Sequence, residues 1–243
     1  MKRFSLLTAI LFFCAGLQAQ FNDSTFYMIR YTSTGIINRT NEASSYAINN
    51  GLRFSIIKKA FSLNSTNAWV YGQQQHQLTN NDFSTALDGN WYRSNKKFYY
   101  WGLGTYESSY SLKVNNRTQM GAGIAYKLID TTNFLINLSD GLLYEFADLQ
   151  LSDTTKDIYS TWRNSFRFRL RYIFKDRVTV ENLSFIQNSL QDKDDYIINT
   201  TTSVSVKLFK WISFTSALKY NKVTRNKRDN LLLTFGITAE KYF

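Results

Sequence analysis

The sequence predicts an all-β fold, a transmembrane antiparallel up-and-down β-barrel of about twelve strands. Runs of alternating apolar and polar residues recur along the chain, the connections between them alternate between short and long, and the C-terminal residue is the aromatic Phe243. In hydrocarbon only a helix or a closed barrel satisfies every backbone polar group, and barrel strands show lipid and lumen alternate side chains. The chain contains no proline, which would interrupt the ladders of a closed sheet.

The N-terminus has the pattern of an export signal. Two basic residues precede an apolar stretch, Phe4–Leu17, that is too short to span a membrane, and the small Ala19 follows it. We therefore expect a secretory signal peptide over 1–19, which leaves 20–243 as a single outer-membrane barrel domain. Cys14 is the only cysteine and lies within the signal, so no disulfide, thiolate metal site or cysteine nucleophile is expected after cleavage.

The composition is basic and only moderately apolar. The net charge is +11 and the mean hydropathy is −0.32, and no apolar run after residue 20 approaches the ~20 residues of a membrane helix. A nucleic-acid partner is excluded because the chain carries an export signal and its basic residues alternate along strands. Ion pairs in the lumen and the anionic phosphates of outer-membrane lipids explain the charge better.

The first seven strands are expected at approximately 26–37, 46–56, 60–73, 82–93, 97–110, 122–128 and 133–148. The second and sixth alternate most regularly: apolar residues occupy every other position from Tyr46 to Ile56 with few exceptions, and from Ala122 to Leu128. In the seventh strand Asp140 falls on the apolar parity. A β-bulge near Asp140–Gly141 would restore the alternation.

The last five strands are expected at approximately 162–174, 177–190, 196–208, 212–220 and 231–243. In the first of these, apolar and aromatic residues fill the even positions except Asn164. The odd positions carry the residues that we call the arginine ladder: Arg163, Arg167, Arg169 and Arg171. A helix would scatter these arginines, whereas a strand places them on one face. The apolar parity changes within 177–190, which predicts a second bulge near Glu181–Asn182.

The connections and the aromatic residues suggest an orientation. Connections after even-numbered strands are short, and those after odd-numbered strands are long and polar, for example Gln73–Asn81, Leu149–Asp157 and Val223–Asp229. This asymmetry is typical of short periplasmic turns and longer outer loops, with both termini in the periplasm. Aromatic residues gather near the strand ends, as in the two interfacial belts of membrane barrels.

The chain resembles a known family, the salt-induced outer-membrane proteins, also described as domain of unknown function 481. The resemblance rests on Asn116–Arg117 followed by Gly121–Gly123 and Tyr126, on the run Arg163–Tyr172, and on the last two hairpins, Asp194–Phe243. It covers roughly the C-terminal two thirds of the chain. It implies an outer-membrane location and a barrel, and the family offers no catalytic residues. The terminal Phe243 resembles the signal by which barrel-assembly machinery recognises the last strand.

The arginine ladder must face the lumen, because one arginine facing lipid at the bilayer midplane costs about 2–4 kcal/mol. Glu145 and Glu181 are inward-facing acids on the flanking strands, and Glu107 and Glu240 are further candidate partners. Two interpretations remain open. The charges either tie and fill the lumen or line a path for anions, and a barrel of about twelve strands fits both.

Candidate chemistry is sparse. His76 is the only histidine, and a lipid hydrolase would need Ser62, Ser65 or Ser84 beside it. Asp192, Asp194 and Asp195 suit a weak calcium site or a solvated turn. The outer basic loop, Lys222, Arg225, Lys227 and Arg228, suits lipid phosphates or simple solubility. No catalytic, cofactor or metal residue is predicted.

We therefore expect an integral protein of the Gram-negative cell outer membrane. The leading hypothesis is a non-enzymatic envelope or stress-related barrel of unknown specific role, with an arginine-lined charged lumen. The alternative is a narrow anion-preferring diffusion pore, and the distant alternative is a lipid-modifying enzyme. Expected partners are outer-membrane lipids, including their anionic phosphates, and the barrel-assembly machinery.

Overall fold

The structure is a computed structural model that describes residues 26–40, 43–92, 97–152 and 154–243. The predicted signal peptide 1–19, with Cys14, and the predicted turn Ser94–Lys96 lie outside the described residues. Within the described ranges, no helix is long and apolar enough to cross a membrane.

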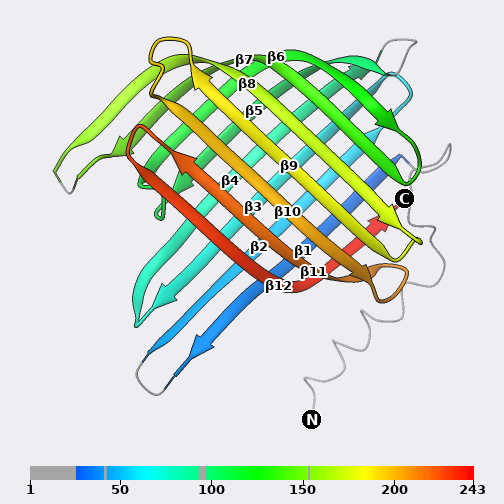
Figure 1. Cartoon of the computed structure of the whole chain (residues 1–243), viewed down its shortest axis with the longest axis horizontal. Helices are drawn as coiled ribbons and strands as arrows, with labels where there is room; N and C mark the ends of the chain where they lie inside the picture. The colour runs from blue at the N-terminus through cyan, green and yellow to red at the C-terminus, as the bar shows by residue number, and fades with distance from the viewer. Residues whose placement is uncertain (1–25, 41–42, 93–96, 153) are drawn as a thin grey trace.

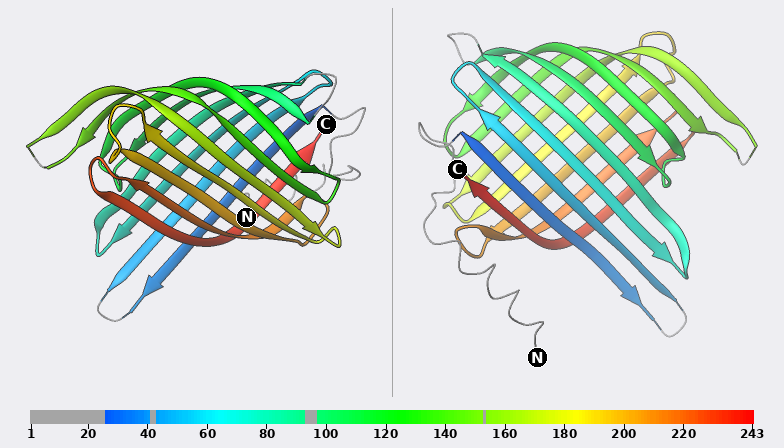
Figure 2. Two further views of the ribbon diagram at one scale, coloured as in Figure 1. Left: turned by 45° about the horizontal axis from the view of Figure 1, so that its top comes forward. Right: turned by 180° about the vertical axis from the view of Figure 1, so that it is seen from behind.

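Twelve antiparallel strands close into one barrel, which confirms the predicted fold (Figure 1). The strands are β1 (Tyr27–Arg39), β2 (Ser44–Ile57), β3 (Phe61–Gln74), β4 (Gln77–Tyr92), β5 (Phe98–Ser109), β6 (Val114–Asp130), β7 (Phe134–Gln150), β8 (Lys156–Phe174), β9 (Val178–Ser189), β10 (Tyr196–Lys207), β11 (Ile212–Val223) and β12 (Arg228–Tyr242). Each strand pairs with its neighbour in sequence, and the strands wind obliquely around the barrel (Figure 2).

The first and last strands meet at a seam that is shorter than the neighbouring ladder. Met28–Gly35 of β1 pair with Phe235–Tyr242 of β12, whereas β1 pairs with β2 over its whole length. The rings of Tyr27 and Phe243 stack at 5.8 Å where the seam ends. We call the rim at which β1 begins and β12 ends the terminal rim, and the opposite rim the distal rim.

The predicted alternation of short and long connections holds only in part. The connections after β7 and β9 (151–155 and 190–195) are longer than those after β6 and β8 (131–133 and 175–177), but the connection after β3 is short. The expected long loop Gln73–Asn81 is a tight turn at Gln75 and His76, both of which have positive φ (51° and 63°). Strand β4 starts at Gln77 and β8 starts at Lys156, earlier than expected. The polar residues that were expected to form long loops at the distal rim therefore belong largely to the strands, where their backbone groups continue the hydrogen-bond ladder of the sheet.

The two predicted β-bulges are also wrong. The pairing of β7 with β8, and of β9 with both of its neighbours, shows no register shift. Asp140 faces outward, and its Oδ1 accepts a hydrogen bond of 2.9 Å from Asn164 Nδ2. The two residues that break the apolar pattern of adjacent strands are thus partners, so neither strand needs a bulge. The observed register shifts lie closer to the strand ends, at Gly72/Gln73, Glu107/Ser109, Val114/Asn116 and Lys127/Ile129.

Outward-facing aromatic pairs mark the height of the apolar band. Phe134 and Tyr172 pack edge to face at 5.6 Å near the terminal rim, and Tyr144 and Trp162 do so at 5.2 Å toward the distal rim. About ten residues of β7 separate the pairs, which corresponds to roughly 25 Å along the barrel axis for a strand tilted by about 40°. That height equals the usual apolar band of a membrane barrel, and Asp140 lies between the pairs.

Replacing Asp140 by leucine should stabilise the barrel. A carboxylate that faces hydrocarbon is unfavourable, and its bond to Asn164 compensates only in part, so we expect a gain of about 1 kcal/mol. Urea unfolding in lipid vesicles would measure it. The matched variant Asn164→Leu should shift stability in the opposite direction, because it leaves the carboxylate without its donor. A loss of stability in Asp140→Leu would contradict this interpretation of the outer face.

The indole ring of one tryptophan, Trp101, packs on the inner face of the barrel wall against two glycines, Gly123 and Gly141. Trp101 of β5 is 3% exposed and its Nε1 donates to the carbonyl of Ile124 at 3.1 Å. A Cβ atom at Gly123 would lie 2.7 Å from the indole Cζ2, and one at Gly141 would lie 2.5 Å from it. The ring therefore lies against the backbone of β6 and β7, where only glycine leaves it room.

Candidate functional site

The lumen has two unlike walls. Strands β2, β3 and β4 present small inward side chains, among them Ala47, Gly51, Ala68, Ser84 and Ala86. Thr66 faces inward on the same wall and is nevertheless exposed. Strands β6 to β9 instead present large polar side chains that are buried: Arg117, Gln119, Glu145, Arg163 and Gln187. The side chains of the first wall therefore extend less far into the lumen than those of the second wall.

A buried ion cluster, the distal cluster, fills the lumen beside the second wall. It consists of Glu145, Arg163 and Asp195, none of which is more than 1% exposed. Arg163 Nη2 lies 2.8 Å from Glu145 Oε1 and 2.9 Å from Asp195 Oδ1. The hydroxyl of Tyr159 donates to Glu145 Oε1 at 2.7 Å. Arg117 Nε lies 3.7 Å from the other carboxylate oxygen of Glu145, Oε2. Burial of these three charges is tolerated because each of them has several hydrogen-bonding or ion-pair partners.

Hydrogen bonds continue this packing across the lumen. Gln119 of β6 donates to Gln187 of β9 at 2.8 Å and to Glu145 at 2.6 Å. Toward the distal rim, the β11–β12 turn folds onto the β5–β6 connection, where Asn226 donates to the carbonyl of Leu112 at 2.6 Å. Below this contact lies an apolar cluster of Leu112, Val114, Ala147, Leu149 and Val223.

Arg225 attaches the same turn to the distal cluster. Its Nε lies 2.5 Å from Asp157 Oδ2, its Nη1 lies 3.2 Å from Asp195 Oδ2, and its guanidinium lies 3.7 Å from the centre of the Tyr159 ring. Burial lowers the pKa of Arg225, but the hydrogen bonds to Asp157 and Asp195 outweigh it and raise that pKa above its ordinary value. Arg225 stays charged, and the turn is fixed over one side of the distal mouth.

A second group of charges, the terminal cluster, lies closer to the terminal rim and is more open. Arg30 pairs with Glu181 at 3.0 Å and also with Glu240, and Arg167 pairs with Asp88 at 2.9 Å. These side chains are between 13% and 27% exposed, in contrast to the distal cluster. The arginines of this cluster are Arg30, Arg53, Arg167, Arg169 and Arg171, and its acids are Asp88, Glu181 and Glu240. Five positive and three negative charges leave a surplus of +2 (5 − 3).

Three arginines of the terminal cluster account for the surplus. Among the described residues, no carboxylate lies within 4.0 Å of Arg53, Arg169 or Arg171. Arg53 bonds only neutral groups, Ser55 at 3.2 Å and Asn64 at 2.9 Å. The buried Nε of Arg171 has no hydrogen-bond partner, although Arg171 lies directly opposite Glu181 in the register of β8 and β9. That carboxylate reaches across the lumen to Arg30 instead.

The residues predicted for the lumen are thus divided between two clusters. Arg163 and Glu145 belong to the distal cluster, and Arg167, Arg169, Arg171 and Glu181 belong to the terminal cluster. Sequence reasoning missed Arg30, Arg53, Asp88 and Asp195. All but Asp195, which lies just before β10, have the inward parity of their strands, and that signal could have found them. Their partners could not be found, because ion pairs across a lumen depend on the closure of the barrel.

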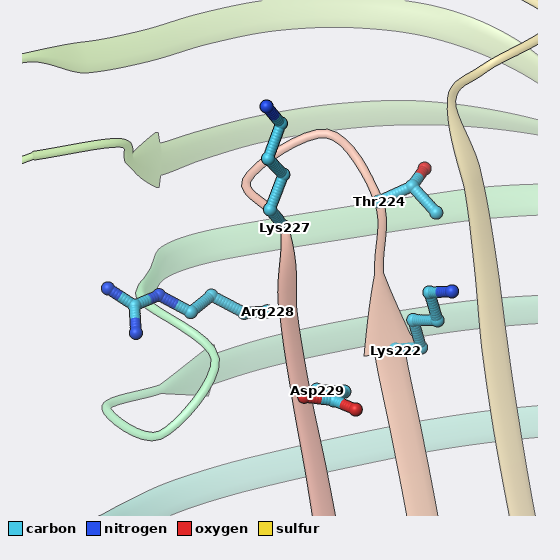
Figure 3. Close-up of a pocket in the computed structure, with 5 residues that line it drawn as sticks. All are labelled: Lys222, Thr224, Lys227, Arg228 and Asp229. Atoms are coloured by element: carbon cyan, nitrogen blue, oxygen red, sulfur yellow. The ribbon is translucent and has the colours of Figure 1, made fainter.

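The predicted basic loop does not form one surface. Arg225 turns inward, while Lys222, Lys227 and Arg228 line a shallow pocket with Thr224 and Asp229 at the distal rim. Figure 3 shows that these three cationic side chains point in different directions. Lys222 also donates to the hydroxyl of Tyr196 at 3.2 Å. The pocket therefore does not chelate a single anion.

The structure does not bring the candidate catalytic and calcium residues together. His76 lies in the β3–β4 turn at the distal rim, whereas Ser62 lies at the other end of β3, roughly 40 Å away along the strand. Ser65 faces outward, where it accepts from Asn67 at 3.4 Å, and Ser84 lies within β4 on the inner face. Asp195 is buried in ion pairs and is not part of a solvated turn. Within the described ranges, no group of three His, Cys, Asp or Glu residues could hold a metal ion.

Comparison with known proteins identifies the family. The model of the family described as "Protein of unknown function, DUF481" matches residues 33–239. The chain belongs to this family. The match begins in β1 and extends well beyond the C-terminal two thirds on which the resemblance was recognised. No curated protein matches the chain.

Solved barrels share the fold of this family member at low sequence identity. The translocator domain of the autotransporter NalP from Neisseria meningitidis is 12% identical, with a TM-score of 0.52 over 90% of this chain and 89% of that chain. The NanC porin is 10% identical, with a TM-score of 0.51 over 89% and 99%. An outer membrane channel from Pseudomonas putida F1 is 10% identical, with a TM-score of 0.51 over 95% and 99%. The DUF481 chain therefore has the fold of outer-membrane β-barrels.

Proposed function

We propose that this protein is a non-enzymatic outer-membrane barrel whose lumen is a narrow channel that prefers anions. The observation that carries the proposal is the surplus of arginine in the terminal cluster, where Arg53, Arg169 and Arg171 lack carboxylate partners. The wall of small residues supplies the space, and the arginines supply a positive potential where a solute passes. In this proposal the signal peptide is cleaved and the terminal rim faces the periplasm, which places the arginines near the inner mouth.

The reversal potential of the purified protein in a planar bilayer tests the proposal. Under a potassium chloride gradient, the wild-type protein should show a reversal potential of the sign given by chloride permeation. The double variant Arg169→Glu/Arg171→Glu changes the charge of the terminal cluster from +2 to −2 (+2 − 4), so the sign should reverse.

A matched control separates the lumen from the outer face. Lys241→Glu changes a charge on the outward side of β12 near the same rim and should leave the sign unchanged. A wild-type protein that inserts but gives no current would overturn the channel proposal. A channel that conducts with no preference between the ions would overturn the role of the arginines.

A sealed barrel that supports the envelope is the second candidate function. The observation that favours it is the distal cluster with the β11–β12 turn above it, because buried ion pairs and apolar packing occupy part of the cross-section. In this alternative the same arginines only stabilise the barrel by linking its strands across the lumen. The bilayer measurement decides between the two functions, since a sealed barrel conducts neither ion.

Two partners belong to the same proposal. Phe243 is half exposed on the outward face and its amide bonds the carbonyl of Tyr27 at 3.0 Å, which suits the recognition of the last strand by assembly machinery. Lys222, Lys227 and Arg228 point apart, which suits several phosphates of a lipid surface better than one bound anion (Figure 3).

A further inference from the structure

The carboxylates of the terminal cluster are unevenly distributed among its arginines. Glu181 lies within electrostatic reach of four arginines: Arg30, Arg53, Arg169 and Arg171. Its Oε2 bonds Arg30, and Glu240 is the second acid on that same arginine. Two of the three acids of this cluster therefore pair with Arg30, and the third, Asp88, pairs with Arg167. Arg53, Arg169 and Arg171 consequently have no carboxylate of the described residues within 4.0 Å.

These three guanidinium groups come from facing walls. Arg53 lies on the wall of small residues, opposite Thr66 in the register of β2 and β3, and the charges of Arg30 and Arg169 act on it. Arg169 and Arg171 lie two residues apart on β8, which places both on the inward face about 7 Å apart. The three side chains thus enter the lumen from two facing walls.

We infer that Arg53, Arg169 and Arg171 form a saturable binding site for a divalent oxyanion, a phosphate or a dicarboxylate. This inference rests on the proposed anion preference and adds a site and a ligand class to it. A guanidinium group presents several N–H donors in a plane that matches two oxygens of a carboxylate or phosphate. The buried Nε of Arg171 is a donor without an acceptor, which such an oxygen would supply.

The charge of the ligand follows from the surplus. Two negative charges would neutralise the +2 of the terminal cluster, whereas chloride supplies one charge and lacks the pair of oxygens that accepts two parallel N–H bonds from one guanidinium group. Inorganic phosphate is therefore the probe, and succinate tests whether the site accepts a dicarboxylate. Chloride at equal ionic strength controls for screening.

The test is phosphate binding to the purified full-length barrel in detergent, measured by titration calorimetry and by the thermal unfolding midpoint at constant ionic strength. The wild-type protein should bind saturably, and its midpoint should rise with phosphate concentration. The variant Arg169→Gln/Arg171→Gln should bind about tenfold or more weakly, because it removes two charged hydrogen-bond donors from the site. Arg53→Gln should weaken binding in the same direction.

Lys219→Gln is the matched control. Lys219 faces the lumen from β11, so this variant removes one charge from the interior without removing a member of the site, and the affinity should change by less than about twofold. Heat-modifiable gel mobility establishes that each variant is a folded barrel. An equal loss in Lys219→Gln would overturn the inference, since it would indicate a diffuse positive field.

The outcomes separate this inference from the channel proposal. An anion-selective current without saturable phosphate or succinate binding would overturn the site and leave the channel standing. Saturable binding that depends on Arg169 and Arg171 in a barrel that gives no current would overturn the channel and support the site. Succinate binding without phosphate binding would support the site and restrict it to dicarboxylates.

Discussion

Replacing Arg163 by methionine is expected to lower the free energy of unfolding by about 3–5 kcal/mol. Arg163 is fully buried and makes the shortest ion pairs of both Glu145 and Asp195, neither of which is more than 1% exposed. Without it, two carboxylates remain in a space that water does not reach. A loss of this size is a large fraction of the ~5–15 kcal/mol that stabilises an ordinary domain.

Urea unfolding in lipid vesicles, followed by gel mobility, would measure this loss. Arg39→Met, at the exposed distal end of β1, is the matched control and should change stability by less than about 0.5 kcal/mol. The double variant Arg163→Met/Glu145→Gln should recover part of the loss, because one unpaired charge is removed with its partner. A single variant as stable as the wild type would show that water enters the distal cluster.

Replacing Trp101 by alanine should cost about 3–5 kcal/mol as well, for a different reason. The indole fills the space over Gly123 and Gly141, and no neighbouring side chain can replace it there because both positions lack a Cβ. The guanidinium of Arg167, 5.2 Å from the indole centre, also loses one of its two cation–π partners and keeps Phe185 at 5.8 Å. The result would be a cavity in the barrel wall and a less constrained arginine.

Trp91→Ala is the informative control for this effect. Trp91 is 57% exposed on the outer face of β4, so its removal should cost clearly less than the removal of Trp101 in the same vesicle assay. Equal losses in the two variants would mean that the glycine surface inside the barrel contributes nothing specific. The intrinsic tryptophan fluorescence of the two single variants would also show which indole reports on unfolding.

The strands and their faces could be predicted because a period of two is a local property. The even positions of β8 face outward and its arginines face inward, as the alternation of that segment alone requires. The partners of those arginines could not be predicted in the same way. Asp88 reaches Arg167 from β4, and Arg30 reaches Glu181 from β1, and both contacts exist only after the sheet has closed.

The errors share one physical cause. Within a single strand only a bulge can restore a broken alternation, so the sequence of β7 alone predicts a bulge at Asp140. The solution lies on the neighbouring strand, where Asn164 breaks its own pattern and supplies the donor. Likewise the polar stretch around His76 was expected to be a loop, but two residues with positive φ suffice to reverse the chain.

The seam between β1 and β12 dictates an order of assembly. Met28 pairs with Tyr242, so the earliest strand cannot find its final neighbour until the last has been synthesised and delivered. Until that moment both strands expose unpaired amides and carbonyls, which invite adhesion to other chains. Both edges are covered only when β1 and β12 pair, and the rings of Tyr27 and Phe243 stack where that pairing ends.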